Sequence, residues 1–211
     1  MQSVTIVGIG RIGGALSLAL AEAGYKIDSL IYRNPAIAKL VAAIIEPAPR
    51  MSAFSDEWVE GADIVILTVS DPAISSVASE CVGKISSNSV VLHTSGSLTS
   101  EALKVIAESG GSVGSMHPLV SIANPLTGKD SFREAYFCVE GDEAATNAAS
   151  EMASALGGIP FSIETKMKSL YHAAAVTSCG HFVALIDAAV EMLTDCGIEK
   201  AHAQKMLLPL I

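Results

Sequence analysis

Two apolar runs of different character open the chain, and three glycines separate them. Val4–Val7 is a β-branched run, typical of a buried strand in a parallel sheet. Ile12–Ala23 is a run of helix formers in which Leu16 and Leu20 share one face. The motif GIGRIG, Gly8–Gly13, joins the two runs. A strand, a glycine-rich turn and a helix in this order predict a unit that binds the pyrophosphate of a dinucleotide.

Each glycine of the motif has its own expected role. Gly8 permits the sharp turn, Gly10 lets the pyrophosphate approach the backbone, and Gly13 lets the helix lie close to the strand. The start of the helix, at Arg11 and Ile12, offers free N–H groups and the positive end of the helix dipole. The Arg11 side chain either reaches a phosphate or points to solvent. A glycine-rich turn without a ligand is the alternative for the motif, whereas a signal peptide is not expected, because no Lys or Arg precedes the apolar run.

The residues after the second expected strand bear on the choice of cofactor. This strand, Ile27–Tyr32, leads into Tyr32-Arg33-Asn34, and no carboxylate follows before Glu46. A carboxylate at this place binds the ribose hydroxyls of NAD, whereas an arginine pairs with the 2′-phosphate of NADP. Arg33 therefore favours NADP, with Tyr32 and Asn34 beside it as further candidate contacts. An ordinary solvated arginine at a strand end is the alternative.

Strand-like and helix-like segments alternate over residues 1–164, which we expect to form one dinucleotide-binding domain. The expected strands are Val4–Val7, Ile27–Tyr32, Ile64–Val69, Ser89–His93, Ser112–Met116, Tyr136–Glu140 and Phe161–Ile163. The expected helices are Ile12–Ala23, Ala36–Ile45, Ser55–Val59, one from Pro72 to Val82, Thr99–Ala107 and Glu143–Leu156. This alternation predicts an α/β fold with a doubly wound parallel (Rossmann) sheet covered on both faces. Ligands of such sheets bind beyond the C-terminal ends of the strands.

Residues 165–211 are expected to form an all-helical domain for substrate binding and dimerisation. From Lys166 to Cys196 there is no proline, only one glycine and much Ala, Leu and Val, which indicates one long, largely buried helix. Gly197 is expected to end it, and another helix is expected within Ile198–Ile211. So short a helical segment cannot bury a two-sided helix alone. We therefore expect a homodimer through these helices and a domain that is incomplete at residue 211.

Composition excludes several classes of protein. Half of the residues are hydrophobic, 17% are charged, and the net charge is −9 without a cluster of basic residues, which argues against nucleic-acid or anionic-membrane binding. No uninterrupted apolar run is expected to span a bilayer. The cysteines form no CxxC pair, so we expect core residues in a reducing compartment and neither disulfides nor a metal site. They are Cys81, Cys138, Cys179 and Cys196. We therefore expect a soluble cytoplasmic protein.

Small and polar residues follow the strand expected at Ile64–Val69, at the edge of the sheet where ligands bind. Thr68, Val69 and Ser70 are candidates for flanking the ribose and the nicotinamide. A plain strand-to-helix turn with Asp71 as its cap explains the same residues equally well.

The next two strands also end in polar residues. One leads into HTSGS, His93–Ser97, which combines hydroxyls, a glycine and exposed N–H groups. Thr94 is a candidate cofactor contact, and Ser95 is a candidate for binding a carboxylate or a carbonyl oxygen of the substrate. A serine-rich turn is the alternative. His117 ends the following strand and either faces the substrate or has a structural role.

A further candidate pair lies at the start of the long helix, in KSLYHAAAV. Lys168 and His172 are four residues apart and therefore share one helix face. An ammonium there can donate to a carbonyl oxygen that becomes an alkoxide on hydride transfer, and His172 can orient the substrate or share the proton. A lysine extended along the helix surface and a packed histidine are the alternative.

The order of these motifs along the chain resembles one family. GIGRIG, YRN, TVSDPAI, HTSGSL, SMHPL and YHAAAV together resemble the Rossmann-like proteins with a C-terminal domain of unknown function, DUF2520, described as F420-dependent NADP oxidoreductase-like. That family is similar to 6-phosphogluconate and 3-hydroxyisobutyrate dehydrogenases, pyrroline-5-carboxylate reductase, prephenate dehydrogenase and ketopantoate reductases. In the hydroxyacid dehydrogenases a catalytic lysine is followed four positions on by asparagine. Lys168 matches that lysine, but His172 stands at the place of the asparagine.

The resemblance implies an NADP-dependent oxidoreductase that acts on a small carbonyl or hydroxy acid, with F420 left open as a cofactor. It also implies a longer helical domain and a dimer. Two other functions remain open. One is a dinucleotide sensor without turnover, which His172 in place of asparagine favours. The other is a reductase of cyclic imines, for which Thr177 and Ser178 are the candidate hydroxyl donors.

Overall fold

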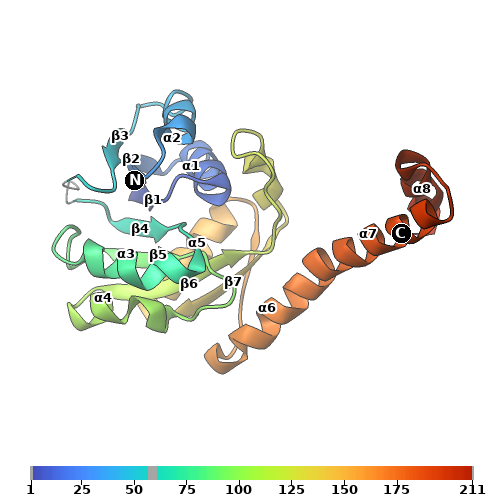
Figure 1. Ribbon diagram of the computed structural model, residues 1–211. Helices are drawn as coiled ribbons and strands as arrows, with labels where there is room; N and C mark the ends of the chain where they lie inside the picture. The colour runs from blue at the N-terminus through green and yellow to red at the C-terminus, as the bar shows by residue number, and fades with distance from the viewer. Residues whose placement is uncertain (1, 57–60, 211) are drawn as a thin grey trace. The chain divides into compact units, whose positions relative to one another are not determined.

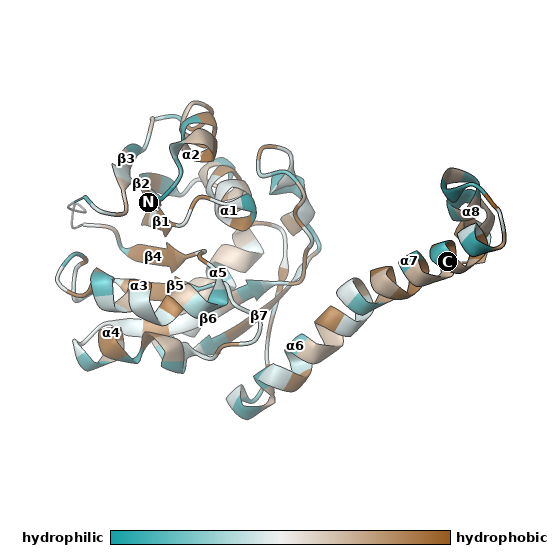
Figure 2. Ribbon diagram, viewed as in Figure 1, coloured by the Kyte–Doolittle hydropathy of each residue, from teal (hydrophilic) through white to brown (hydrophobic). Residues whose placement is uncertain are grey.

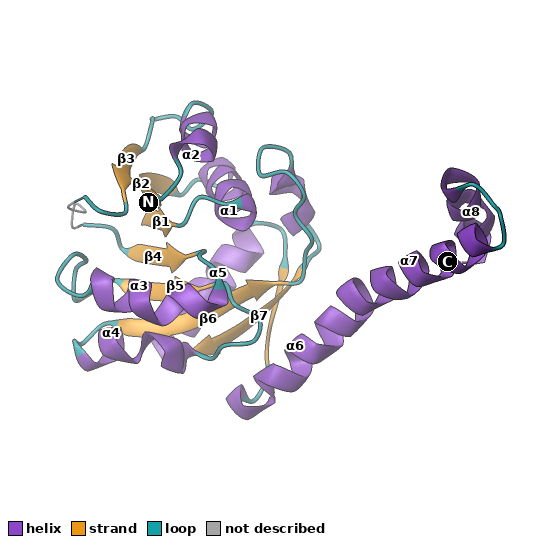
Figure 3. Ribbon diagram, viewed as in Figure 1, coloured by secondary structure: helices purple, strands orange, loops and turns teal. Residues whose placement is uncertain are grey.

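The computed structural model describes residues 2–56 and 61–210 of the 211-residue chain. The chain forms two compact units, Met1–Ser169 and Leu170–Ile211. The first unit is a sheet with helices on both faces, and the second is helical (Figures 1 and 3). The alternation of strands and helices that the sequence predicts is thus present in the first unit.

The first unit is built on an 8-stranded sheet with the order β3-β2-β1-β4-β5-β6-β7-β8. The strands are β1 (Ser3–Val7), β2 (Lys26–Tyr32), β3 (Arg50–Ala53), β4 (Ile64–Leu67), β5 (Val90–His93), β6 (Ser112–Pro118), β7 (Tyr136–Gly141) and β8 (Ile159–Ser162). The chain reverses its direction across the sheet between β1 and β4, because β3 lies beyond β2 on one side and β4 begins the other side. In open α/β sheets this reversal is the place where ligands bind.

The sheet is mostly parallel, and β7 is the exception to the parallel sheet that the sequence predicts. β7 pairs with β6 in the antiparallel sense, with Ser115 opposite Glu140, and β8 is parallel to β7. The segment between β6 and β7 contains the short 3₁₀ helix η3 (Gly128–Phe132) and no crossover helix. Parallel neighbours are usually joined by a crossover α-helix, which this connection lacks. Leu119 N–H donates to the carbonyl of Tyr136 at 2.9 Å, where the turn closes.

Helices cover both faces of the sheet (Figure 1). They are α1 (Arg11–Glu22), α2 (Pro35–Ala42), η1 (Asp71–Ala73), α3 (Ile74–Cys81), η2 (Ser100–Leu103), α4 (Lys104–Glu108) and α5 (Glu143–Ala155). One core cluster joins α1, α2 and α5 to the sheet, and a second joins α3, η2 and α4 to it. Strand β4 lies between these layers, all four of its residues are buried, and Figure 2 draws it brown.

One expected boundary, one strand that was not expected and one expected helix outside the described residues mark the differences from the sequence prediction. Helix α2 begins as expected, with Asn34 Oδ1 accepting from the N–H of Ala36, but it ends at Ala42 and not at Ile45. The sequence did not predict β3, a short edge strand with no fully buried residue, because its residues lack an apolar run. The helix expected at Ser55–Val59 falls largely on residues 57–60, which lie outside the described part of the chain.

The second unit is helical, as expected, but its helix is exposed. The helical path begins in the first unit with η4 (Thr165–Met167) and the start of α6 (Lys168–Val176). It continues in the second unit through the rest of α6, a π-helical turn η5 (Thr177–His181), α7 (Phe182–Asp195), α8 (Lys200–Leu207) and η6 (Leu208–Leu210). Gly197, with φ +87°, lies between α7 and α8, as predicted. The expectation of a largely buried helix is wrong for the single chain, because Val183, Leu185 and Met192 are 63%, 70% and 68% exposed.

This helix is long and apolar enough to cross a bilayer by length and mean composition, although its apolar run is interrupted by polar residues. Thr165–Asp195 spans 31 residues with a mean hydropathy of 1.6 in its most apolar stretch, of which 6% is buried. Core helices of soluble proteins have the same length and composition, so these two properties do not by themselves make it a membrane span.

The cysteines also divide between the two units. All four are free thiols; Cys81 and Cys138 are buried, as expected of core residues, whereas Cys179 and Cys196 are exposed. The exposed pair lies in the second unit, so the expectation of four buried cysteines fails for the same reason as the expectation of a buried helix.

Candidate functional site

The Gly8–Gly13 motif forms a tight turn between β1 and α1. Gly8 has φ +99°, a conformation that favours glycine, and its N–H donates to the carbonyl of Ile31 at 2.8 Å. A Cβ on Gly13 would lie 2.2 Å from the carbonyl oxygen of Gly8 and 2.4 Å from Oγ1 of Thr68. Only a glycine therefore allows α1 to start this close to the strand, which is the role that the sequence predicts for Gly13.

Gly10 has a different environment, and this environment bears on the ligand. A Cβ on Gly10 would meet no heavy atom within 4 Å, so the fold itself does not require a glycine there. Gly10 is also the N-cap of α1, and no side chain caps the helix. No side-chain cap therefore accepts from the first N–H groups of α1, which begin at Arg11 and Ile12. Such a cradle fits the pyrophosphate of a dinucleotide, whose negative charge the helix N-terminus attracts.

Arg33 follows β2 at the same edge of the sheet. Its guanidinium carbon lies 5.2 Å from the centre of the Phe54 ring, a cation–π contact that holds the side chain beside the strand end. Phe54 N–H donates to the carbonyl of Tyr32 at 2.8 Å, which places the aromatic ring next to the end of β2. The side-chain oxygen of Asn34 caps α2, so its side-chain NH₂ group is the part that a ligand could contact. The preference of this edge for NADP stays a prediction.

The end of β4 supports the glycine turn. Thr68 Oγ1 donates to the carbonyl oxygen of Gly8 at 2.6 Å, and Cγ1 of Val69 lies 2.7 Å from the place of a Cβ on Gly8. The two residues thus hold the turn in place, while Ser70 is exposed at the start of η1. The contacts that the sequence predicts between these three residues and the cofactor stay predictions.

The HTSGS loop after β5 is held by its own side chains. The N–H of Ser95 donates to Nδ1 of His93 at 3.2 Å, and Nε2 of His93 lies 3.1 Å from the carbonyl of Thr99, to which it donates as the protonated nitrogen. Ser95 Oγ accepts from the N–H groups of Ser97 and Leu98 at 3.2 and 3.0 Å. The imidazole therefore closes the loop at both ends, a role that the sequence reading did not assign to it.

Asp71 ties the same loop to the neighbouring strand end. Ser97 Oγ donates to Oδ2 of Asp71 at 2.6 Å, and Ser95 Oγ lies 3.3 Å from Ser97 Oγ. Asp71 belongs to η1, which follows β4, so residues from two adjacent strand ends are joined by these hydroxyls. The N–H of Thr94 also donates to the carbonyl of Leu67, the last residue of β4, at 3.2 Å.

A buried ion pair lies beneath this loop. Lys168 Nζ donates to Oε1 of Glu140 at 2.8 Å and to Oγ of Ser115, and the Lys168 side chain is fully buried. Glu140 also accepts from Ser100, at Oε1 from its N–H and at Oε2 from its Oγ–H, each at 2.9 Å. Lys168 belongs to the first unit, so the whole cluster lies within that unit.

Burial and charge act in opposite directions on the ionisable groups of this cluster. Burial raises the pKa of Glu140, but the hydrogen bond and the charge of Lys168, with Ser100 and Ser115, outweigh it and hold that pKa below its usual value. Burial lowers the pKa of Lys168, against the opposing effect of Glu140. Burial also lowers the pKa of His93 to about 4, and the positive charge of Lys168 adds to this effect. The imidazole of His93 is thus neutral at pH 7 beside the Lys168–Glu140 pair.

The structure brings some of the candidate catalytic residues together and separates others. Ser95 and Lys168 both lie in the first unit, where Lys168 joins the cluster below the loop. His117 lies two residues beyond Ser115 on β6, so the two share a face of the sheet. His172 belongs to the second unit. The proton-donor role predicted for Lys168 stays a prediction, and it requires the ammonium to leave Glu140 or Ser115.

The sequence analysis did not single out Glu140, Ser115 or Ser100. Glu140 lies in an otherwise apolar strand, and a carboxylate that is only 5% exposed needs a buried partner. That lone charge within YFCVE was the available signal. Nothing in the sequence pattern indicated that its partner would be Lys168.

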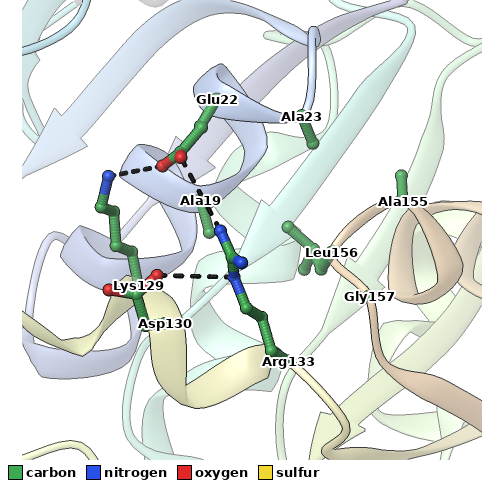
Figure 4. Close-up of a pocket in the computed structure, with 9 residues that line it drawn as sticks. All are labelled: Ala19, Glu22, Ala23, Lys129, Asp130, Arg133, Ala155, Leu156 and Gly157. Atoms are coloured by element: carbon green, nitrogen blue, oxygen red, sulfur yellow. Dashed lines mark hydrogen bonds and ion pairs between the residues drawn. The ribbon is translucent and has the colours of Figure 1, made fainter.

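A separate cavity lies at the other end of α1 from the glycine turn. It has a volume of about 380 Å³ and is drawn in Figure 4. The residues that line it are Ala19, Glu22, Ala23, Lys129, Asp130, Arg133, Ala155, Leu156 and Gly157. Its two positive and two negative charges balance, because Lys129 pairs with Glu22 and Arg133 pairs with both Glu22 and Asp130. It therefore does not belong to the site at the strand ends.

Comparisons with families agree with this geometry. Residues 1–118 match the model of the Rossmann-like domain, and residues 135–211 match the model of a domain of unknown function, DUF2520. The first model covers the strands and the glycine turn of the candidate dinucleotide site, and the second contains Glu140 and Lys168. No curated protein matches the sequence.

Several solved structures have the same fold. BF3122 from Bacteroides fragilis, a proposed NADP oxidoreductase, is 20% identical, with a TM-score of 0.78 over 99% of this chain and 77% of that chain. Protein TM1727 from Thermotoga maritima is 25% identical, with a TM-score of 0.72 over 97% and 74%. Pyrroline carboxylate reductase from Plasmodium falciparum, with NADP bound, is 16% identical, with a TM-score of 0.66 over 99% and 75%.

Proposed function

Because the chain belongs to the Rossmann-like proteins with a C-terminal DUF2520 domain, we propose that it is an NADP-dependent oxidoreductase. The substrate that we propose is a small carbonyl compound or hydroxy acid. A bound nicotinamide dinucleotide supplies or accepts the hydride, and the chain binds both molecules and orients them.

The observation that carries this proposal is the contrast between Gly13 and Gly10. Gly13 is required by the packing of α1 on β1, whereas a Cβ on Gly10 would lie in open space at an uncapped helix start. A glycine that the fold does not need, at a place where an anion is attracted, supports a ligand that approaches the backbone. The NADP bound to the pyrroline carboxylate reductase with the same fold supports the same cofactor class.

The remaining roles follow from the strand ends. We propose that Arg33, held by Phe54, pairs with the 2′-phosphate. The hydroxyl-rich loop around Ser95 and the half-buried His117 then contact the substrate. Ser95 suits a carbonyl or carboxylate oxygen because its position is fixed by the N–H groups of Ser97 and Leu98.

The test is a binding and turnover experiment with the purified chain. NADPH, NADH and F420 are titrated by calorimetry, and the cofactor that binds most tightly is then offered with a panel of 2-oxo acids and cyclic imines. We expect NADPH to bind and at least one 2-oxo acid to oxidise it. Binding of none of the three cofactors would contradict the proposal, and turnover of cyclic imines alone would move it to imine reduction.

A second function is favoured by the state of Lys168. The Lys168 side chain is fully buried, and its ammonium donates to Glu140 and Ser115. A protein that keeps a dinucleotide cradle but no accessible proton donor would act as a dinucleotide sensor. Tight NADPH binding without turnover of any member of the panel would favour the sensor over the enzyme.

We also propose that the protein is a soluble, cytoplasmic homodimer. The exposed apolar side chains of α7, with Leu185 at 70% exposure, form a surface that a single chain leaves in contact with water. A second copy of the chain would bury such a surface, because large exposed apolar patches mark interaction sites.

A further inference from the structure

Several buried polar side chains of the first unit gather at one place below the loop that follows β5. They are His93, Ser95, Ser115, Glu140 and Lys168. They come from β5, its loop, β6, β7 and the start of α6, and His93, Ser115 and Glu140 are direct neighbours across the sheet. Burying an ion pair costs free energy in desolvation, which its own attraction rarely repays. A cluster of this kind therefore calls for a role beyond stability.

The carboxylate of Glu140 connects the ion pair to the loop. Both of its oxygens accept from Ser100, Oε1 from the N–H and Oε2 from the Oγ–H, at 2.9 Å each. Ser100 is the first residue of η2 and follows the loop directly. The residue before it, Thr99, is the N-cap of η2 but makes no side-chain cap, so Glu140 of β7 takes the place of that cap.

The other side-chain contacts of the loop come from β5 and η1. His93 binds Ser95 and Thr99, and Asp71 binds Ser97. Glu140 is thus the contact that fixes the far end of the loop to a different strand. Without it, this end of the loop loses its bonds to β7 and keeps the bond of Thr99 to His93 and the packing of the buried Leu103 of η2, so the loop would move more freely.

We propose that Glu140 is a positioning residue, which acts through Ser100 to hold the His93–Ser100 loop in the geometry that binds substrate. Lys168 keeps the carboxylate of Glu140 ionised and so strengthens both of its bonds to Ser100. This proposal rests on the proposed function, since the loop is the candidate substrate contact. It gives Glu140 no contact with the substrate or the cofactor.

The test separates a local effect on the loop from a loss of overall stability. Glu140→Gln removes the charge, and Ser100→Ala removes one donor while the ion pair stays intact. Glu108→Gln is the control, since Glu108 is an exposed carboxylate of the same unit that pairs with Lys104. Amide hydrogen exchange is measured for every residue of the three variants and of their Glu140→Gln/Ser100→Ala combination, without cofactor or substrate.

We expect the amides of Ser97, Leu98 and Ser100 to exchange at least tenfold faster in Glu140→Gln. In Ser100→Ala, the amides at positions 97, 98 and 100 should exchange about threefold faster. The combination should exchange no faster than Glu140→Gln alone, because both changes act on the same bonds. The amides of β1 and β4 and the Glu108→Gln control should exchange at the unaltered rate. If Glu140→Gln does not fold, Ser100→Ala decides the test.

Two outcomes would overturn the proposal. One is loop exchange in Ser100→Ala that equals that of the unaltered chain, and the other is faster exchange throughout the sheet, which marks a purely structural ion pair. A separate titration with NADPH tests the proposed function, and here we expect Ser100→Ala to change affinity less than twofold. With a substrate found, kcat/KM of Ser100→Ala should fall while the KM for NADPH is unaltered. Failure of NADPH to bind the unaltered chain would contradict the proposed function and leave the loop result intact.

Discussion

Lys168 and Glu140 form an ion pair of 2.8 Å in which the lysine side chain is fully buried and the glutamate side chain is 4% exposed. The pair joins the first residue of α6 to β7. Each partner makes further hydrogen bonds, Lys168 to Ser115 and Glu140 to Ser100, so the charges are satisfied on all sides. Removing one partner of such a pair is expected to lower the free energy of unfolding strongly, whereas replacing both partners is expected to change it little.

The first prediction follows from this difference. Lys168→Met leaves the Glu140 carboxylate buried without its cation and should lower the free energy of unfolding at pH 7 by about 3–5 kcal/mol. Lys168→Met combined with Glu140→Gln removes both charges and should recover most of that loss. Urea unfolding of both variants measures the two values. A single variant as stable as the unaltered chain would show that the ion pair does not form.

The second prediction concerns pH. Burial lowers the pKa of His93 to about 4, below the value of about 6.5 expected in the unfolded chain. The folded state therefore favours the neutral imidazole, and the stability that this contributes is present above about pH 6.5 and is lost as the pH falls toward 4. The loss should reach about 3 kcal/mol. Unfolding free energies measured from pH 7 to 4 should fall more steeply for the unaltered chain than for His93→Gln; parallel curves would contradict the assignment.

The third prediction compares two glycines of one turn. Gly13→Ala places a Cβ 2.2 Å from the carbonyl oxygen of Gly8 and should lower the free energy of unfolding by about 1–3 kcal/mol or more. Gly10→Ala meets no atom within 4 Å and should leave stability within about 0.5 kcal/mol. The same Gly10→Ala variant should bind NADPH at least about tenfold more weakly, a difference of about 1.4 kcal/mol. Thermal unfolding and calorimetry measure the two effects, and unaltered NADPH affinity would place the ligand elsewhere.

The fourth prediction concerns the choice between NADP and NAD. Arg33→Ala removes the guanidinium that stacks on Phe54 and should weaken NADPH binding by about 1.5–3 kcal/mol, the range for hydrogen bonds to charged groups. NADH lacks the 2′-phosphate and serves as the control ligand, whose affinity should hardly change. Equal affinities of the unaltered chain for NADH and NADPH would rule this role out.

The fifth prediction concerns assembly. Leu185→Glu puts a charge on the exposed apolar surface of α7 and should convert a dimer to a monomer at micromolar concentration, as light scattering measures. Glu191→Gln changes an exposed polar residue of the same helix and is the control, which should remain dimeric. An unaltered chain that is monomeric and binds no dye for exposed apolar surface would refute the dimer.

The sequence alone determines the parts of this protein that depend on neighbouring residues. The pattern of Val4–Val7, Gly8–Gly13 and the following helix predicts the strand, the turn and α1, because each depends on local conformational preference and on apolar spacing. Asn34 predicts its own cap, and Gly197 predicts the end of α7, for the same reason. These elements are confirmed within a few residues of their expected bounds.

Only the tertiary structure decides features that depend on residues far apart in the chain. The direction of β7 depends on how residues 119–135 return to the sheet, which no periodicity records. Glu140 meets Lys168 across 28 residues, and Ser100 meets Glu140 across 40. The sequence accordingly predicts that Lys168 is an accessible donor at a helix start, whereas the fold buries its ammonium. Whether a charge is paired, and with which partner, follows from packing, because desolvation makes a buried charge stable only where a partner of opposite charge is brought to it.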